Sequence, residues 1–300
     1  MSEQERRVVV PGGELAVFDH GGSGPDVLLV HSVCHSSPVW DDVIAALGGQ
    51  ARLVTVDLRG HGHSTAPAGD VDEIPADLVR VVEALELRRP VLVGHDVGGG
   101  FVAAVAADRP DLLGGLVVVD SPVVEEQAAV RALVETVGAE TIVEMLTQRF
   151  GLGQTGPDEA SREAFVDARS PVNAADLLSP SPDEAGLRRL LEHATVTEPG
   201  APVGSWVFRP TPATVRALTR DPGAAAFQPG RELLADLEVP VAVVIASNGR
   251  NGTGGQGLLD LAAAHPNVQL VHLDTGPHSL YTNADDVADA IREVLARHDS

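Results

Sequence analysis

The strongest constraint on the fold is a regular alternation of short β-branched runs with helical stretches. The runs that predict strands are Arg7–Val10, Glu14–Asp19, Val27–His31, Arg52–Asp57, Val91–His95, Leu116–Asp120, Val241–Ala246 and Val268–Leu273. The patterns that predict helices are Val39–Leu47, Ile74–Leu87, Gly99–Asp108 and Ala284–Arg297. Such alternation is typical of strands joined by crossover helices. The sequence therefore predicts an α/β protein with a mostly parallel eight-stranded sheet.

The strand rhythm stops in the middle of the chain. Residues 123–235 are richer in helix formers, and Pro- and Gly-containing segments interrupt them. We therefore expect a core formed by residues 1–122 and 236–300, with residues 123–235 inserted as a helical lid. The Gly-rich segment Asn248–Gln256 is expected to be a surface loop.

Charge and composition narrow the expected partners. The formal net charge is −22, and all 21 basic residues are arginine. A chain this acidic has no basic cluster that could bind a nucleic-acid backbone or an anionic membrane surface. We expect a small apolar substrate. The sequence does not decide whether the chain forms a homodimer. The single cysteine, the polar N-terminus and the lack of an apolar run of about 20 residues predict a cytoplasmic protein.

The segment Val91–Gly100 carries the main chemical signal. An apolar strand runs into the sequence Gly-His-Asp-Val-Gly centred on Asp96, and a helix follows near Gly99. The two glycines permit a sharp strand-to-helix turn that exposes the middle side chain. The helix N-terminus favours negative charge at this point. We interpret Asp96 as a nucleophile; the alternative is an aspartate that only caps the helix.

Two further residues are expected to complete a catalytic triad. His278 follows the last predicted strand, in the chain order nucleophile, acid, histidine. The turn after Val241–Ala246 contains no carboxylate, whereas the run Leu116–Asp120 ends on one. Asp120 is therefore expected to lie about 2.6–3.2 Å from a His278 ring nitrogen and to stabilise its cationic form. The alternatives are a strand-end aspartate and a loop histidine without a catalytic role.

Backbone amides near the nucleophile are expected to form an oxyanion hole. The N–H groups of Val33 and Val97 would face the developing negative charge. His61 and His63 lie two residues apart in a Gly-rich turn with no third ligand in the sequence, so no metal site is predicted. No cofactor is expected either.

These features resemble the epoxide hydrolase and haloalkane dehalogenase branch of the α/β-hydrolase superfamily. The resemblance covers His31–Trp40, Asp57–Ser64, Gly94–Gly98, Asp120 and His278. It implies the α/β-hydrolase fold and an aspartate nucleophile that displaces a leaving group at a saturated carbon. A histidine-activated water would then hydrolyse the alkyl-enzyme ester. Several members of this branch place the acid after the sixth strand, as expected here for Asp120.

The chain departs from that branch around the site. The usual sequence His-Gly-x-Pro reads His-Ser-Val-Cys at residues 31–34, so a differently shaped oxyanion loop is expected. The residue just after the nucleophile, where the branch holds a halide with tryptophan or a carboxylate with arginine, is Val97. Epoxide hydrolases supply lid tyrosines, but the single tyrosine, Tyr281, lies outside the predicted lid.

The candidates for binding the substrate are therefore Trp206, His35 and Gln148, with His193 as a further lid residue. We favour Trp206, because an indole N–H can serve a halide or an epoxide oxygen. Each of these residues could instead be structural. The leading hypothesis is a hydrolase of a small or natural-product epoxide, and the first alternative is a haloalkane-type dehalogenase. A non-hydrolytic lyase, cyclase or ligand-binding protein on the same fold is the alternative from a different class.

Overall fold

The computed structural model describes residues 3–124, 128, 132, 135–177, 184–198, 200–218, 230–248, 255–276 and 279–298. Within these residues, eight strands form one sheet in the order β1-β2-β4-β3-β5-β6-β10-β11. Their bounds are β1 Gln4–Val10, β2 Gly13–Asp19, β3 Asp26–Val30, β4 Arg52–Val56, β5 Val91–His95, β6 Gly115–Val119, β10 Val241–Ala246 and β11 Val268–Leu273. Only the pairs β1–β2 and β2–β4 are antiparallel among these neighbours. The predicted mostly parallel sheet is confirmed.

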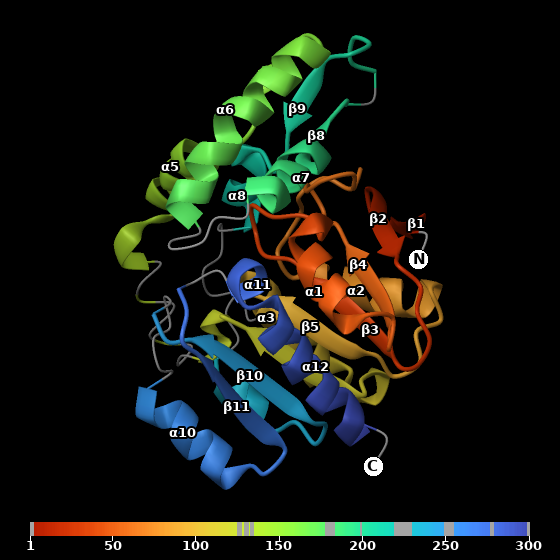
Figure 1. The fold of residues 1–300 in the computed structure, drawn as a ribbon, viewed down its shortest axis with the longest axis vertical. Coiled ribbons are helices and arrows are strands. Elements are labelled where there is room, and N and C mark those ends of the chain that lie inside the picture. The colour runs from red at the N-terminus through yellow and green to blue at the C-terminus, as the bar shows by residue number, and fades with distance from the viewer. Residues whose placement is uncertain are drawn as a thin grey trace.

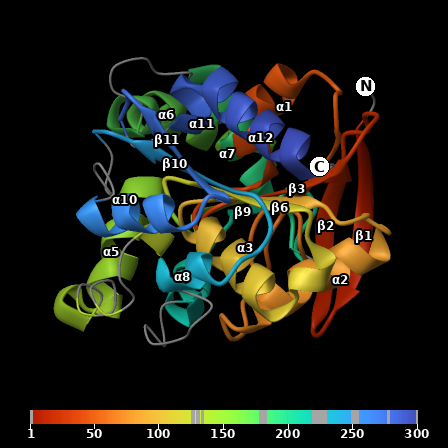
Figure 2. The ribbon, with the colours of Figure 1, turned by 90° about the horizontal axis from the view of Figure 1, so that it is seen from below.

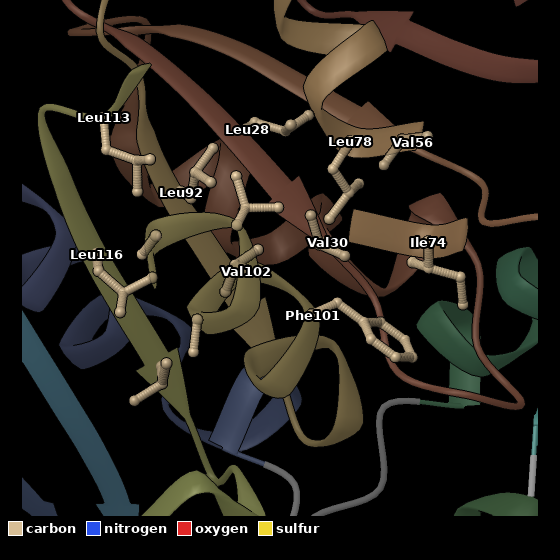
Figure 3. Packing of buried hydrophobic residues seen from close by; sticks show 14 of the residues in the cluster. Leu28, Val30, Val56, Ile74, Leu78, Leu92, Phe101, Val102, Leu113 and Leu116 are labelled. Atoms are coloured by element: carbon tan, nitrogen blue, oxygen red, sulfur yellow. The ribbon is translucent and has the colours of Figure 1, made fainter. Parts of the chain in front are cut away.

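Helices cover both faces of this sheet. Helices α1 (Asp41–Leu47) and α12 (Ala284–His298) lie on one face, and α2 (Glu73–Ala84) and α3 (Val97–Asp108) lie on the other (Figure 2). Along β3, Leu28 packs into the α2/α3 layer, whereas Leu29 packs into the α1/α12 layer. Figure 3 shows the first of these layers, in which Phe101 and Leu78 pack among the strand side chains. Burial of both faces explains why the core strands are continuous apolar runs.

The segment between β6 and β10 forms a cap on one side of the sheet (Figure 1). Helices in the described part of this segment include α5 Ala139–Phe150, α6 Glu159–Leu177, α7 Glu184–Ala194 and α8 Pro212–Leu218. Helix α9 (Glu232–Ala235), at the end of the segment, packs on α3 of the core. Three short strands, β7 Thr155–Gly156, β8 Thr195–Val196 and β9 Trp206–Phe208, pair antiparallel in the order β7-β9-β8. The prediction of a purely helical lid missed this sheet, because strands of two or three residues are too short to show a period.

Shorter elements complete the described chain. They are η1 Ser37–Trp40, η2 Pro110–Leu112, η3 Pro122–Val124, α10 Gly255–Ala264 and α11 Ser279–Thr282. The predicted loop Asn248–Gln256 falls mostly outside the described residues, and its last two residues begin α10 instead. No helix among the described residues combines the length and the apolar character that crossing a membrane requires.

The cap rests on the loop that follows β3. Helix α7 packs against η1, which is part of that loop. The apolar interior of the cap also includes Cys34, which precedes η1 and packs with Phe150 and Leu187 in one buried cluster. Because parallel strands end at the same edge of a sheet, the loops after β3 and β5 are neighbours there. The cap is thus anchored beside the turn that carries Asp96.

Candidate active site

Asp96 occupies a sharp turn between β5 and α3. Its backbone has φ 48° and ψ −120°, a conformation that a non-glycine residue adopts only when its surroundings impose it. A Cβ at Gly94 would lie 2.4 Å from the Gly98 carbonyl oxygen, and a Cβ at Gly98 would lie 2.5 Å from the carbonyl oxygen of His31. Strand and helix can therefore approach this closely only because both positions are glycine. The predicted elbow is present, and the Asp96 side chain is partly exposed on it.

The predicted oxyanion amides lie on the two segments that flank Asp96. Val97 is the first residue of α3, and the first amides of a helix have no partner within the helix. Val33 lies in a tight turn after β3, in which the His35 N–H donates to the Ser32 carbonyl at 3.1 Å and Cys34 has φ 69°. A positive φ is uncommon at a non-glycine residue. Whether the loop differs in shape from that of the resembling branch stays a prediction. The role of the two amides stays a prediction.

Ser32 is a site residue that the sequence did not single out. Its hydroxyl donates to Asp96 Oδ2 at 2.7 Å, and its side chain is fully buried. The signal was present in the sequence, because Ser32 stands where the resembling branch has glycine. A glycine cannot donate from a side chain, so this departure adds a hydrogen-bond donor next to the carboxylate.

Asp120 directly follows β6, and hydrogen bonds hold both of its carboxylate oxygens. Its Oδ1 accepts from the Ala246 N–H at 2.7 Å, and its Oδ2 accepts from the Ser279 hydroxyl at 2.6 Å. Burial raises the pKa of the Asp120 carboxyl, and the nearby negative charge of Asp96 adds to this rise. The hydrogen bonds from Ser279 and Ala246 act in the opposite direction but do not cancel it. Asp120 is therefore an oriented carboxyl group in the neighbourhood of Asp96.

His278 lies outside the described residues, so its distance from Asp120 stays a prediction. Its chain neighbour Ser279 is tied directly to the Asp120 carboxylate. At the end of β10, the described residues Ser247 and Asn248 carry no carboxylate. This arrangement supports the choice of Asp120 over a seventh-strand acid.

His35 lies at the junction of the loop and the cap. Its Nδ1 donates to the Val33 carbonyl at 3.2 Å, and its ring centroid is 6.2 Å from that of Phe150 in α5. Burial lowers the pKa of His35, which favours the neutral ring. With the proton on Nδ1, the buried Nε2 is an acceptor, and it has no hydrogen-bond partner among the described residues. His35 is thus suited to accept a hydrogen bond rather than to donate a proton.

The other two predicted substrate residues lie in the cap. The Trp206 indole N–H donates to the Ser161 hydroxyl oxygen at 3.0 Å, so its one N–H donor is engaged within the cap. Trp206 and Ser161 line a hollow of about 480 Å³ together with Phe165 and Arg169. The side chain of Gln148 is exposed on α5.

His193 forms a separate pair with Asp57, which follows β4. The His193 Nε2 donates to Asp57 Oδ2 at 2.7 Å, and the same carboxylate accepts from the N–H groups of Ser37 and His63, each at 2.8 Å. Burial by itself would raise the pKa of Asp57, but the His193 charge and hydrogen bond outweigh it and leave this pKa below its ordinary value. Burial likewise lowers the pKa of His193, yet Asp57 outweighs that effect and raises it overall. This pair links the core to the cap.

The two histidines of the Gly-rich turn have structural contacts. His61 Nδ1 donates to the Arg59 carbonyl at 2.9 Å, and the His63 ring stacks on His193 with 4.1 Å between centroids. Among the described residues, no group of three or more His, Cys, Asp or Glu is placed to hold a metal ion.

Comparison with known proteins gives a family and several relatives. A family model described as the alpha/beta hydrolase fold matches residues 25–285. Fluoroacetate dehalogenase from Burkholderia sp is 35% identical over 123 residues, which are 39% of this chain and 40% of that protein. The 2-(acetamidomethylene)succinate hydrolase from Mesorhizobium japonicum is 28% identical over 187 residues, 59% of this chain and 62% of that protein. The chain thus spans less than two thirds of the length of these two curated relatives.

Solved structures share the fold over the whole chain. A thioesterase domain from the curacin biosynthetic pathway superposes with a TM-score of 0.72 at 22% identity, covering 98% of this chain and 100% of that one. A crystal structure of E-2-(acetamidomethylene)succinate hydrolase gives a TM-score of 0.70 at 20% identity, with both chains fully covered. At these identities the likeness concerns the fold alone.

Proposed function

Because the chain belongs to the alpha/beta hydrolase family, we propose that it is a cofactor-independent hydrolase whose nucleophile is the Asp96 carboxylate. The observation that carries this proposal is the position of Asp96 on the strained turn between β5 and α3. A carboxylate there can attack carbon but cannot act like an esterase serine, whose hydroxyl a histidine must deprotonate. The reaction that suits a carboxylate nucleophile is displacement at a saturated carbon.

The proposed reaction has two steps. In the first, one Asp96 oxygen forms a bond to a substrate carbon and the bond from that carbon to its leaving oxygen breaks, giving an alkyl-enzyme ester. The leaving oxygen takes a proton from solvent and becomes a hydroxyl group. In the second, His278 removes a proton from water, which attacks the ester carbonyl carbon. The acyl–oxygen bond then breaks, and the leaving oxygen takes the proton held by His278, so the product leaves as a diol. The Asp96 carboxyl returns one proton to solvent and is again a carboxylate.

The surroundings of Asp96 support this assignment. The amides of Val33 and Val97 would stabilise the negative charge that develops on the ester carbonyl in the second step. Asp120 would orient His278 and stabilise its cation.

We place epoxides first among the substrates, and haloalkanes second. Dehalogenation is favoured by one observation, the 35% identity to fluoroacetate dehalogenase over part of the chain. Against it, Val97 offers neither an indole nor a guanidinium group to a halide or a substrate carboxylate. An epoxide needs no halide site, because its leaving oxygen stays attached to the product.

Trapping the ester tests this function. The His278→Ala variant would be mixed with styrene oxide or with 1-bromobutane and analysed by intact-protein mass spectrometry and peptide mapping. We expect an adduct on Asp96, because the variant can form the ester but cannot activate water to hydrolyse it. An epoxide adduct carries the whole epoxide mass, whereas a haloalkane adduct carries only the alkyl group, so the two substrate classes are separated. The variant His278→Ala/Asp96→Asn is the control and should stay unmodified.

Two other outcomes would contradict the proposal. If neither compound modifies Asp96 in His278→Ala, the covalent mechanism is wrong for these substrate classes. If the compounds instead bind unchanged to the wild-type protein, the chain belongs with the ligand-binding or non-hydrolytic members of the fold.

A further inference from the structure

Ser32 holds one oxygen of the Asp96 carboxylate. Its buried hydroxyl donates to Oδ2 at 2.7 Å. The Ser32 carbonyl is itself fixed, because it accepts from His31 Nδ1 at 2.7 Å and from the His35 N–H at 3.1 Å. The hydroxyl therefore projects from a residue whose carbonyl group is held by two hydrogen bonds. This rigidity is what a catalytic donor requires, since a preorganised dipole need not reorient during the reaction.

We propose that the Ser32 hydroxyl is a third oxyanion donor, acting with the Val33 and Val97 amides on the ester that Asp96 forms. This inference rests on the covalent mechanism proposed above. With Oδ2 held by Ser32, Oδ1 attacks the substrate carbon and Oδ2 becomes the ester carbonyl oxygen. When water adds to the carbonyl carbon, the π electron pair moves onto Oδ2, which becomes an oxyanion. When that pair returns, the bond from the acyl carbon to Oδ1 breaks, and Oδ1 takes the proton held by His278 and leaves with the product as a hydroxyl group.

The hydrogen bond from Ser32 acts differently in the two steps. During ester formation, negative charge leaves the Asp96 carboxylate, so a hydrogen bond to Oδ2 stabilises the reactant at least as much as the transition state. During ester hydrolysis, negative charge accumulates on Oδ2, so the same bond is stronger in the transition state than before it. Only an interaction that strengthens toward the transition state accelerates a step. Ser32 should therefore accelerate hydrolysis and not ester formation.

A purely positional role for Ser32 makes a different prediction. If the hydroxyl only held the carboxylate in its attacking orientation, its loss would slow ester formation first. The specificity constant kcat/KM reports the steps up to ester formation, whereas kcat reports hydrolysis when the ester accumulates. The two roles are thus separated by which of these constants changes.

The loop provides a matched control. Ser36 is also fully buried and lies four residues further along the same loop. Its hydroxyl has no hydrogen-bond partner among the described residues, and it makes no side-chain cap to η1. Ser36→Ala therefore removes the same group from the same loop without removing a bond to Asp96.

The test compares Ser32→Ala, Ser32→Gly and Ser36→Ala with the wild-type protein, using styrene oxide and 1-bromobutane as probes. Rapid quenching followed by mass spectrometry gives the rates at which the Asp96 ester forms and decays. For both Ser32 variants we expect decay to slow by about 10²-fold, the effect of removing one oxyanion donor. Ester formation should change by less than about threefold, so kcat and KM fall together while kcat/KM stays nearly constant. Ser36→Ala should match the wild type.

The inference is overturned if the ester decays at the wild-type rate in both Ser32 variants, or if formation and decay slow equally. Ser32→Gly keeps the test valid should Ser32→Ala not fold, because glycine leaves the carbonyl bonds of this residue in place. Failure of the covalent mechanism looks different. In that case no Asp96 ester appears even in His278→Ala, where Ser32 is unchanged.

Discussion

Two carboxylates that follow strands of the same sheet differ in almost every property that decides whether a carboxylate can react. Asp57, after β4, is fully buried and its two oxygens accept three hydrogen bonds. Asp96, after β5, is partly exposed and stands on a strained turn at the beginning of a helix. Asp57 has a histidine at hydrogen-bond distance, yet its oxygens are enclosed by donors. A histidine–aspartate pair at hydrogen-bond distance is therefore no evidence of catalysis by itself.

The Asp57–His193 pair has a structural position. Asp57 belongs to the core, and His193 belongs to α7 of the cap, 136 residues away in the sequence. Asp96 is bonded to another segment of the core instead, because Ser32 in the loop after β3 donates a hydrogen bond to its carboxylate. We infer that the first region holds the cap on the core and that the second carries the chemistry. The substitutions that follow test this division.

The largest effect is expected for Asp96→Asn. An amide cannot displace a leaving group at carbon, so turnover of an epoxide or haloalkane probe should fall on the order of 10⁴-fold or more. The midpoint of thermal unfolding should stay close to that of the wild type, since Asp96 is partly exposed. Activity is measured by product formation, with mass spectrometry to show that the introduced asparagine has not deamidated. Full activity in an Asp96→Asn protein that keeps its amide would place this residue outside the chemistry.

A smaller loss of turnover is expected for Asp120→Asn. His278 would lose its charge partner and its orientation, which lowers turnover by about 10²- to 10⁴-fold. The asparagine can still accept one of the hydrogen bonds from Ala246 and Ser279, so the fold should persist. The ester should accumulate during turnover, because its hydrolysis needs His278 and its formation does not. Wild-type turnover in this variant would mean that another group orients the histidine.

The elements of the core could be predicted well, because their residues alone determine them. Each apolar run from Val27 to Leu273 in the core became a strand, since burial on both faces demands continuous apolar sequence. The elbow was equally visible, because only glycine tolerates the close contact at Gly94 and Gly98. These are local requirements, and a single sequence expresses them directly.

What could not be predicted depends on contacts between distant segments. Trp206 was favoured as a substrate donor for its indole N–H, but that N–H meets Ser161, 45 residues away. His193 looked like a lid donor and instead reaches Asp57 in the core. Ser32 was noticed only as a lost glycine, because its bond to Asp96 spans 64 residues. Residue type shows what a side chain can do, whereas only the fold shows which partner it meets.

Asp57→Asn should destabilise the protein rather than inactivate it chemically. Asparagine replaces one acceptor oxygen with an NH₂ group, which would face a donor N–H in a fully buried site, and His193 loses its charge partner. Breaking a buried pair and leaving a donor unsatisfied lowers the free energy of unfolding by about 2–4 kcal/mol. Chemical denaturation measures this change. The control Asp111→Asn removes an exposed carboxylate paired with Arg109, and should lower the free energy of unfolding far less, because solvent screens an exposed pair. An equal loss of unfolding free energy in both variants would contradict the inference that Asp57 holds the cap on the core.

The smallest effect is a pH dependence that His193→Gln should remove. The pKa of His193 is raised above its ordinary 6.5, because the attraction of Asp57 outweighs the burial of the ring. Glu3 and Asp41 also face the ring and favour its charged form, while the stacked His63 and the nearby Arg189 are the basic groups around it. The charged ring is thus more favoured in the folded than in the unfolded protein. This stabilisation is fully present below pH 6.5 and is lost as the pH rises through the raised pKa of the folded state.

The Asp57 carboxyl does not change this window, because its pKa is lowered and its contribution disappears only in acid below its ordinary 3.8. The difference in unfolding midpoint between wild type and His193→Gln should therefore be larger near about pH 6 than near about pH 9, by about 2–4 °C. His20 and His193 line one hollow of the surface together with Glu3 and Asp41. His20→Gln is therefore the matched control with the opposite sign, because burial lowers the pKa of His20. The difference in unfolding midpoint between wild type and His20→Gln should become smaller toward acid pH. A difference for His193→Gln that is the same at both pH values would mean that the ring is not charged by Asp57, and the pair would then join cap to core by hydrogen bonding alone.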